Sequence, residues 1–262
     1  MMTDAETTVE ARARADGVDG ESQPAFINRE LSWLAFNGRV LEEATNPNHP
    51  LLERLRFLAI SGTNWDEFYM VRVAGLKAQI EEGITAPSQD GLTPAQQLSA
   101  ILEVGSQLMT KQRDIWATLQ AELARQGIRV VTAQELSADD RSWLETWFID
   151  NVFPVLTPLA VDPANPFPFI PNLGVCVFLH LSGADGKDRY ALIPVPTKIQ
   201  RFVRLLGDGI RFIPLEEVIA LFVDSLFPSF TLQKHGCFRV VRDSEIEIDE
   251  RAEDLMLTFE TA

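Results

Sequence analysis

The chain contains few of the residue types that build disulfide, metal or nucleophilic sites. Only two cysteines occur in 262 residues, Cys176 and Cys237, and their separation is not a metal-ligand spacing. Two distant cysteines in apolar surroundings favour a reducing compartment, and we interpret both as buried small hydrophobic side chains. The three histidines, His49, His180 and His235, stand alone in the sequence. His180, on a predicted strand, is interpreted as a surface or hydrogen-bonded residue, and we expect no metal site in this chain.

Basic residues are also scarce. Lys and Arg number 23 against 38 Asp and Glu, for a formal net charge of −15. Nucleic acids and anionic membranes are bound by clustered Lys and Arg, so we expect neither partner, nor a long polyanion held by this chain alone. No segment reaches the ~18 apolar residues of a membrane span, and the acidic N-terminus lacks the layout of a signal peptide. These absences predict a cytoplasmic protein without a transmembrane segment.

Established catalytic motifs are missing from the sequence. It contains no GxxxxGK[ST] phosphate loop, no GxGxxG after a strand, no HExxH and no GxSxG. Acidic pairs such as Glu42-Glu43 and Glu216-Glu217 are adjacent, so on a helix they point in different directions and are interpreted as solvated positions. The residues by themselves therefore predict no complete catalytic apparatus.

Hydrophobic residues make up 46% of the chain, which is enough to bury a core. The length of the chain favours two domains. Residues 1–24 are acidic with few large apolar groups, which predicts a disordered tail. Residues 25–127 carry helical periodicity, and residues 128–262 mix strand and helix patterns. The expected fold class is α+β multidomain, an N-terminal antiparallel helical bundle followed by a mixed α/β head domain.

Local signals place four helices in the first domain. Asn28 has the position of an N-cap, Pro50 suits a first helical turn, and Gly83 is typical of a helix stop. Thr93 and Gln96 form a capping box at the start of a long helix with a near-heptad apolar pattern. Amphipathic helices with short connections predict an antiparallel bundle.

The second domain alternates short strands and helices. We expect strands at 128–131, 173–182, 189–195, 210–213 and 237–241, and helices from Ser137, at 197–206 and at 216–226. The prolines between 154 and 171 predict an ordered or functional loop. Residues 249–262 have one apolar helical face but no stop signal, so we expect the head domain to be truncated there. Whether such a truncation was introduced deliberately, by a frameshift or as a natural short form is left open.

The stretch from Ser61 to Val73 has the highest density of side chains that could bind a ligand or take part in chemistry. Asn64, followed three residues later by Glu67, has the form of a capping box, which predicts a loop that ends in a new helix at Asn64. A cap uses the side-chain oxygen, so the amide NH₂ remains able to donate to a ligand oxygen. A purely capping Asn64 predicts that Asn64→Asp leaves stability unchanged, because Asp caps equally well.

Several long strings of the sequence resemble one family. They are Phe26–Leu41 (FINRELSWLAFNGRVL), Pro50–Leu58 (PLLERLRFL), Asn64–Phe68 (NWDEF) with Val71-Arg72, Leu156–Leu159, Arg189–Pro196 and Val241–Asp243. These strings closely resemble the N-terminal region of bacterial polyphosphate kinase, the long-chain ATP:polyphosphate phosphotransferase. The resemblance extends over about residues 25–262.

The resemblance implies a division of labour. In that family a histidine of the C-terminal half, in domains of phospholipase-D-like fold, takes the ATP γ-phosphate and passes it to polyphosphate with Mg²⁺ as helper. That half is absent here, so the resemblance implies no catalytic residue in this chain, magnesium ligands elsewhere and an inactive isolated chain. The motif Thr63–Phe68 implies that Asn64 binds ATP.

The implied partners are ATP or ADP, inorganic polyphosphate and a second copy, as a dimer or tetramer assembled through the head domain. The alternative is a non-catalytic helical dimerisation or interaction module derived from a truncated paralogue.

Overall fold

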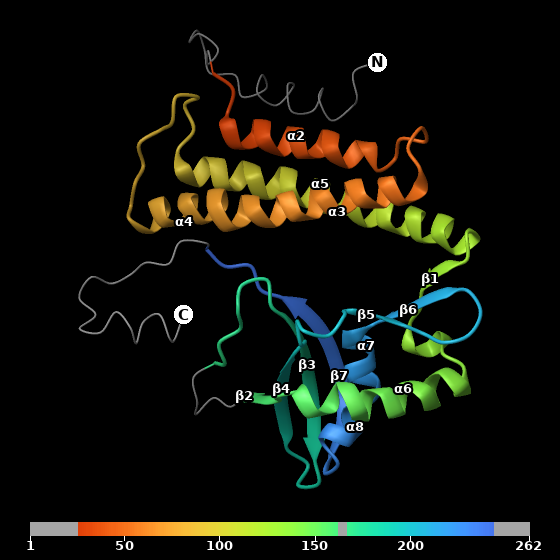
Figure 1. Cartoon of the computed structure of the whole chain (residues 1–262). Helices are drawn as coiled ribbons and strands as arrows, with labels where there is room; N and C mark the ends of the chain where they lie inside the picture. Colours follow the sequence, from red (N-terminus) through yellow and green to blue (C-terminus); the bar gives the residue numbers. More distant parts are fainter. Residues whose placement is uncertain (1–25, 162–166, 244–262) are drawn as a thin grey trace. The chain divides into compact units, whose positions relative to one another are not determined.

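The computed structural model describes residues 26–161 and 167–243 (Figure 1). The described chain divides into two compact units, one of residues 26–116 with 242–243 and the other of residues 117–161 with 167–241. The expected tail at 1–24 and the expected helix at 249–262 lie outside the described residues. The chain has the predicted fold class, a helical N-terminal part followed by an α/β part.

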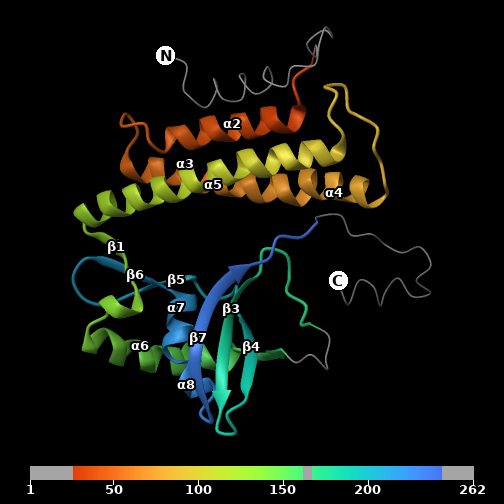
Figure 2. The same ribbon diagram turned by 180° about the vertical axis from the view of Figure 1, so that it is seen from behind.

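The first unit is built from long helices. Its elements are α2 (Arg29–Glu43), α3 (Leu51–Phe68), the π-helical turn η1 (Tyr69–Val73), α4 (Ala74–Glu81) and α5 (Pro94–Arg125), whose last turns belong to the second unit. Because α3, η1 and α4 follow one another without a break, they form a single rod that lies beside α2 and α5 (Figure 2). The bundle therefore has three rods where the sequence predicted four helices.

The missing break is a correction to the sequence prediction. We expected a loop at 61–63, because Asn64 and Glu67 have the form of a capping box that would start a new helix. Ser, Gly, Thr and Asn are also weak helix formers. In the structure these residues are helical, and Ser61, Trp65 and Phe68 continue the inward face of α3, Ser61 and Phe68 fully buried and Trp65 partly. Tertiary packing at helical spacing therefore outweighs the local propensity.

The other helix ends follow the sequence signals. The Asn28 side chain accepts hydrogen bonds from the backbone of Glu30 and Leu31, and Thr93 and Gln96 form the predicted capping box. After α4, Gly83 adopts a φ of +74°, and the bonds Gly83 N–H to Ile80 O and Ile84 N–H to Gln79 O complete a Schellman motif. Each of these predictions is confirmed.

The core of the first unit lies where α2, the α3–α4 rod and α5 meet. It contains the buried residues Leu34, Phe68, Val73, Leu76 and Ile101. The rings of Trp33 and Phe68 stack at a centroid distance of 4.7 Å, which joins α2 to the end of α3. The segment around Asn64 is thus held on a packed scaffold.

The second unit contains two sheets with helices packed beside them (Figures 1 and 2). Its elements are β1 (Ile128–Val130), η2 (Ala133–Glu135), α6 (Ala138–Asn151), η3 (Phe153–Val155), β2 (Leu159–Val161), β3 (Val175–Gly183), β4 (Asp188–Pro194), β5 (Phe202–Arg204), β6 (Ile210–Pro214), α7 (Leu215–Leu221), α8 (Val223–Leu226) and β7 (Phe230–Arg239). One sheet has the order β1-β6-β5 and the other β2-β4-β3-β7. One core cluster, which includes Phe148, Leu179, Ile193, Ile213 and Ile219, links α6 and α7 to both sheets.

Three expectations for this unit are wrong. Residues 197–206 form a turn and strand β5 rather than a helix, because Val203 and Leu205 are buried at strand alternation beside β6. The final strand begins at Phe230, well before residue 237. Cys237 is exposed, since it lies on this edge strand, whereas Cys176 is buried as predicted.

Candidate functional site

Asn64 lies inside α3 rather than at a helix start. The capping box predicted for Asn64 and Glu67 is therefore wrong, because the backbone on both sides of Asn64 is helical. Its side chain instead contacts the neighbouring helix, where Asn64 Nδ2 donates to Asn37 Oδ1 at 3.2 Å. Asn64 thus joins α3 to α2.

The Asn64 amide has a defined orientation. Asn37 is only 1% exposed, and its Nδ2 donates to the backbone carbonyl of Ser61 at 3.1 Å. A carbonyl oxygen can only accept, so Asn37 must point its nitrogen at Ser61 and its oxygen at Asn64. Asn64 must in turn present its nitrogen, and the orientation follows from the hydrogen-bond chain itself.

The third helix completes this polar cluster. Gln112 on α5 donates from Nε2 to Ser61 Oγ at 3.0 Å, and Ser61 is 1% exposed. Three rods of the bundle therefore meet in a chain of hydrogen bonds that runs through Asn64, Asn37, Ser61 and Gln112. Buried polar groups that are satisfied in this way hold their side chains in one arrangement.

Asn64 retains hydrogen-bonding capacity beyond this network. It is partly exposed, and within the described residues its Oδ1 and second amide hydrogen have no assigned partner. A planar amide held by one N–H can donate the other to a phosphate or sugar oxygen and accept through its oxygen. The arrangement offers a neutral, pre-oriented contact rather than a charge.

Trp65, the next residue, packs against a glycine of α5. A Cβ placed on Gly105 would lie 2.6 Å from Trp65 Cη2 and 3.3 Å from Tyr69 Oη. The rings of Trp65 and Tyr69 lie 4.9 Å apart, and burial raises the pKa of Tyr69. Gly105 therefore permits the close approach of α5 to the segment that carries Asn64.

The π-helical turn η1 follows this segment directly. Such turns contain one extra residue per turn and occur frequently at functional sites. Sequence reasoning missed it, because nothing in Tyr69–Val73 differs from an ordinary helical pattern. Within this turn, the Arg72 guanidinium lies 4.0 Å from the Glu30 carboxylate of α2.

Two histidines have partners that the sequence did not indicate. His49 Nε2 lies 2.7 Å from Glu43 Oε2, and hydrogen bonds from Asn46 and then His49 lower the pKa of Glu43. His180 Nε2 lies 3.0 Å from Asp188 Oδ1 without hydrogen-bond alignment. These histidines stand alone in the sequence, but in the structure each lies beside a carboxylate.

Residues 26–161 and 167–243 contain no group of three or more His, Cys, Asp or Glu side chains that could hold a metal ion. In the same residues, no helix combines the length and apolarity needed to cross a bilayer.

Comparisons with known proteins point in one direction. Residues 26–131 match the model of the polyphosphate kinase N-terminal domain, and residues 139–262 match that of the polyphosphate kinase middle domain. The polyphosphate kinase of Erythrobacter litoralis is 45% identical over 94% of this chain, and that of Mycolicibacterium gilvum is 45% identical over 90%. The crystal structure of polyphosphate kinase from Porphyromonas gingivalis matches 87% of this chain with a TM-score of 0.76 and 30% identity.

The matches cover only part of each relative. The chain spans 34% of the Erythrobacter litoralis protein, 33% of the Mycolicibacterium gilvum protein and 34% of the Porphyromonas gingivalis chain. It thus corresponds to about a third of their length.

Proposed function

This chain belongs to the polyphosphate kinase family, and we propose that it acts as the N-terminal part of an enzyme that reversibly transfers the terminal phosphate of ATP to inorganic polyphosphate. In this proposal the phosphate is first transferred to a histidine, which forms a phosphohistidine. That histidine lies in the remaining two thirds of the relatives' length, which this chain does not match. The role left to the described residues is to hold the nucleotide and a second copy of the chain. The proposed compartment is the cytoplasm.

We propose Asn64 as the ATP contact of this chain. The observation that supports it is the hydrogen-bond chain through Asn37 and Ser61, which holds the Asn64 amide in one orientation and leaves a donor unused. Phosphoryl transfer is catalysed largely by positioning and by electrostatic stabilisation of the moving group. A neutral amide on a packed helix supplies positioning.

Among the described residues no group of three or more His, Cys, Asp or Glu could hold a metal ion, and we propose that the magnesium ligands lie in the part of the relatives that this chain does not match. Their role as proposed therefore includes no step through Mg²⁺. When bound, the ion would neutralise charge on the transferred phosphate.

We also propose that residues 128–262 make the contacts of a homo-oligomer, a dimer or a tetramer. Strand β7 supports this proposal, because it ends the sheet order β2-β4-β3-β7 and most of its ten residues are exposed. A long open strand edge offers unpaired N–H and C=O groups to another chain. The alternative function, a non-catalytic interaction module, shares this edge but gives Asn64 no ligand.

The experiment that tests the nucleotide role compares two alanine variants. The chain is joined to the remaining two thirds of the Erythrobacter litoralis relative, and Asn64→Ala is compared with Asn37→Ala. Both variants break the same hydrogen bond, but only the first removes the proposed ligand donor. We expect Asn64→Ala to weaken ATP binding by about tenfold or more. Asn37→Ala should lower stability with a smaller effect on binding.

An equal loss of ATP affinity in the two variants would reduce Asn64 to a structural residue. If the chimera is active and both variants bind ATP with unchanged affinity, the result would favour the alternative that the residues around Asn64 belong to a non-catalytic interaction module.

A further inference from the structure

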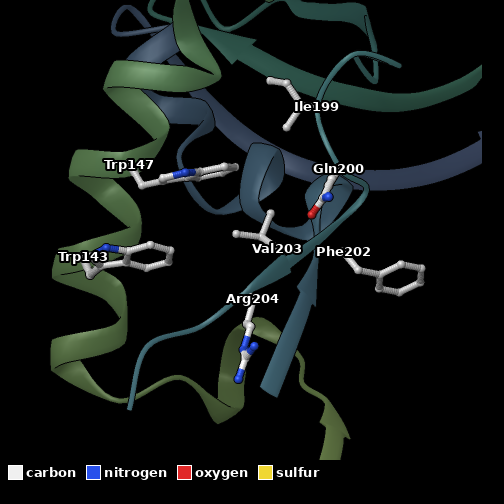
Figure 3. A pocket seen from close by; sticks show the side chains of 7 residues that line it. All are labelled: Trp143, Trp147, Ile199, Gln200, Phe202, Val203 and Arg204. Atoms are coloured by element: carbon white, nitrogen blue, oxygen red, sulfur yellow. The ribbon is translucent and has the colours of Figure 1, made fainter. Parts of the chain in front are cut away.

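A pocket of about 300 Å³ lies in the second unit between α6 and strand β5. Its lining residues are Trp143, Trp147, Ile199, Gln200, Phe202, Val203 and Arg204 (Figure 3). Three consecutive β5 residues line it although their side chains alternate between faces, so the hollow runs along the edge of the strand. Neither the family resemblance nor the proposed function uses this place.

That edge of β5 is open. Strand β5 ends the sheet order β1-β6-β5. Leu205 N–H donates to Arg211 O and Leu215 N–H donates to Arg201 O, so the odd-numbered residues face β6. By strand alternation, the backbone N–H and C=O groups of Phe202 and Arg204 point the other way, toward the pocket. The pocket therefore has alternating main-chain donors and acceptors along one wall.

Two tryptophans form the facing wall. Trp143 and Trp147 project from α6 toward β5, with Val203 between them and the strand (Figure 3). Their rings lie 6.1 Å apart at an interplanar angle of 22°. Both rings are partly buried against the core of this unit. They therefore present fixed aromatic surface on which a flat ligand can stack.

A cation without a partner stands at one end. Among the described residues, the guanidinium of Arg204 has no hydrogen bond or ion pair, and it is exposed. The neighbouring arginines differ, because Arg201 lies 2.6 Å from Glu216 and Arg211 lies 2.8 Å from Asp140. At the other end of β5, Gln200 adds an exposed amide (Figure 3).

We propose that this pocket binds a nucleoside phosphate. The base lies against the tryptophan rings, its polar edge meets the open N–H and C=O groups of β5, and the phosphate pairs with Arg204. The volume is at the lower end of the range for small-molecule sites. A peptide strand fits less well, because β5 offers only three residues for pairing. The site does not depend on Asn64, so it stands or falls separately from the proposed function.

The test is calorimetric titration of the 262-residue chain with ATP, adenosine and tripolyphosphate. ATP carries both base and phosphate, adenosine lacks the phosphate and tripolyphosphate lacks the base. Arg204→Gln removes an exposed cation that has no partner in the described structure, so the fold should persist. Arg125→Gln, an exposed arginine on α5 of the same unit, is the matched control for charge. Trp147→Phe keeps an aromatic ring, whereas Trp147→Leu removes it.

We expect ATP to bind more tightly than either part alone, and Arg204→Gln to weaken ATP by about tenfold with no change for Arg125→Gln. Trp147→Leu should also cost about tenfold, and Trp147→Phe less. The losses of ATP affinity caused by Arg204→Gln and by Trp147→Leu should be the same when Asn64→Ala is also present.

Three results would overturn the proposal. They are absence of ATP binding, ATP binding lost with Asn64→Ala but insensitive to Arg204→Gln, and tripolyphosphate binding as tight as that of ATP.

Discussion

The orientation of the Asn64 amide has a direct consequence for its replacement. Asn64→Asp places a carboxylate oxygen against Asn37 Oδ1, which cannot turn away without losing its bond to Ser61. Two facing acceptors replace a hydrogen bond, so we expect the free energy of unfolding to fall by about 1 kcal/mol or more. Urea denaturation of the two chains measures the difference. Equal stability would contradict the assigned orientation, in which the Asn64 amide donates to Asn37 Oδ1.

A second residue-scale prediction concerns acid stability. Asp140 caps α6 through Ser137 and accepts two bonds from Arg211, each of 2.8 Å. Hydrogen bonds from Arg211, with smaller contributions from Ser137, lower the pKa of Asp140 from 3.8 to about 2. A lowered folded-state pKa stabilises the protein above the unfolded-state value, and this stabilisation is lost progressively as pH falls from about 5 to about 1, through the folded-state value of about 2.

We therefore expect Asp140→Asn to cost roughly 1 to 2 kcal/mol at pH 7, because Arg211 is partly exposed and solvent screens the pair. The difference should fall steeply toward pH 2 and approach zero only near pH 1. Denaturation of both chains across this range is the measurement, and a difference independent of pH would contradict the assignment.

At the scale of elements, the packing of α3 against α5 depends on Gly105. Gly105→Ala puts a methyl group 2.6 Å from Trp65 Cη2, and we expect a loss of about 1–3 kcal/mol of stability. Trp65→Leu should recover part of that loss in the double variant, because the smaller side chain makes room. Thermal unfolding of the two single variants and the double variant measures the coupling.

Gly75→Ala on α4 is the control for helix propensity. Nothing lies within 4 Å of the added Cβ, so this exposed helical position should gain up to about 1 kcal/mol. A similar gain at Gly105 would show that α5 and Trp65 are not in close contact.

At the scale of the whole molecule, chemistry and positioning are expected to separate. We predict that the purified 262-residue chain does not label itself from γ-labelled ATP. Two of its histidines, His49 and His180, lie beside carboxylates, whose negative charge disfavours the approach of a phosphate. Incubation with labelled ATP followed by an acid-sensitivity assay for phosphohistidine is the measurement. Label on His49, His180 or His235 would overturn the proposal that the phosphorylated histidine lies outside this chain.

Local sequence signals determined the helix ends, the hairpin and the family. The caps at Asn28, Thr93 and Ser137 and the stop at Gly83 involve groups only a few residues apart, so the chain specifies them without its tertiary neighbours. The hairpin β3–β4 follows from strict alternation around a turn. The strings that resemble polyphosphate kinase are likewise continuous in the sequence, so the family can be recognised without the structure.

Tertiary structure alone decided the setting of Asn64. Its partner Asn37 is 27 residues away, and Gln112 is 51 residues from Ser61, so neither contact has a local sequence signal. The same holds for β5, where burial of Val203 beside β6 outweighed a helical pattern. The physical reason is that residues 61–64 favour a loop by propensity, while packing of α3 between two other rods makes helix the lower free-energy state.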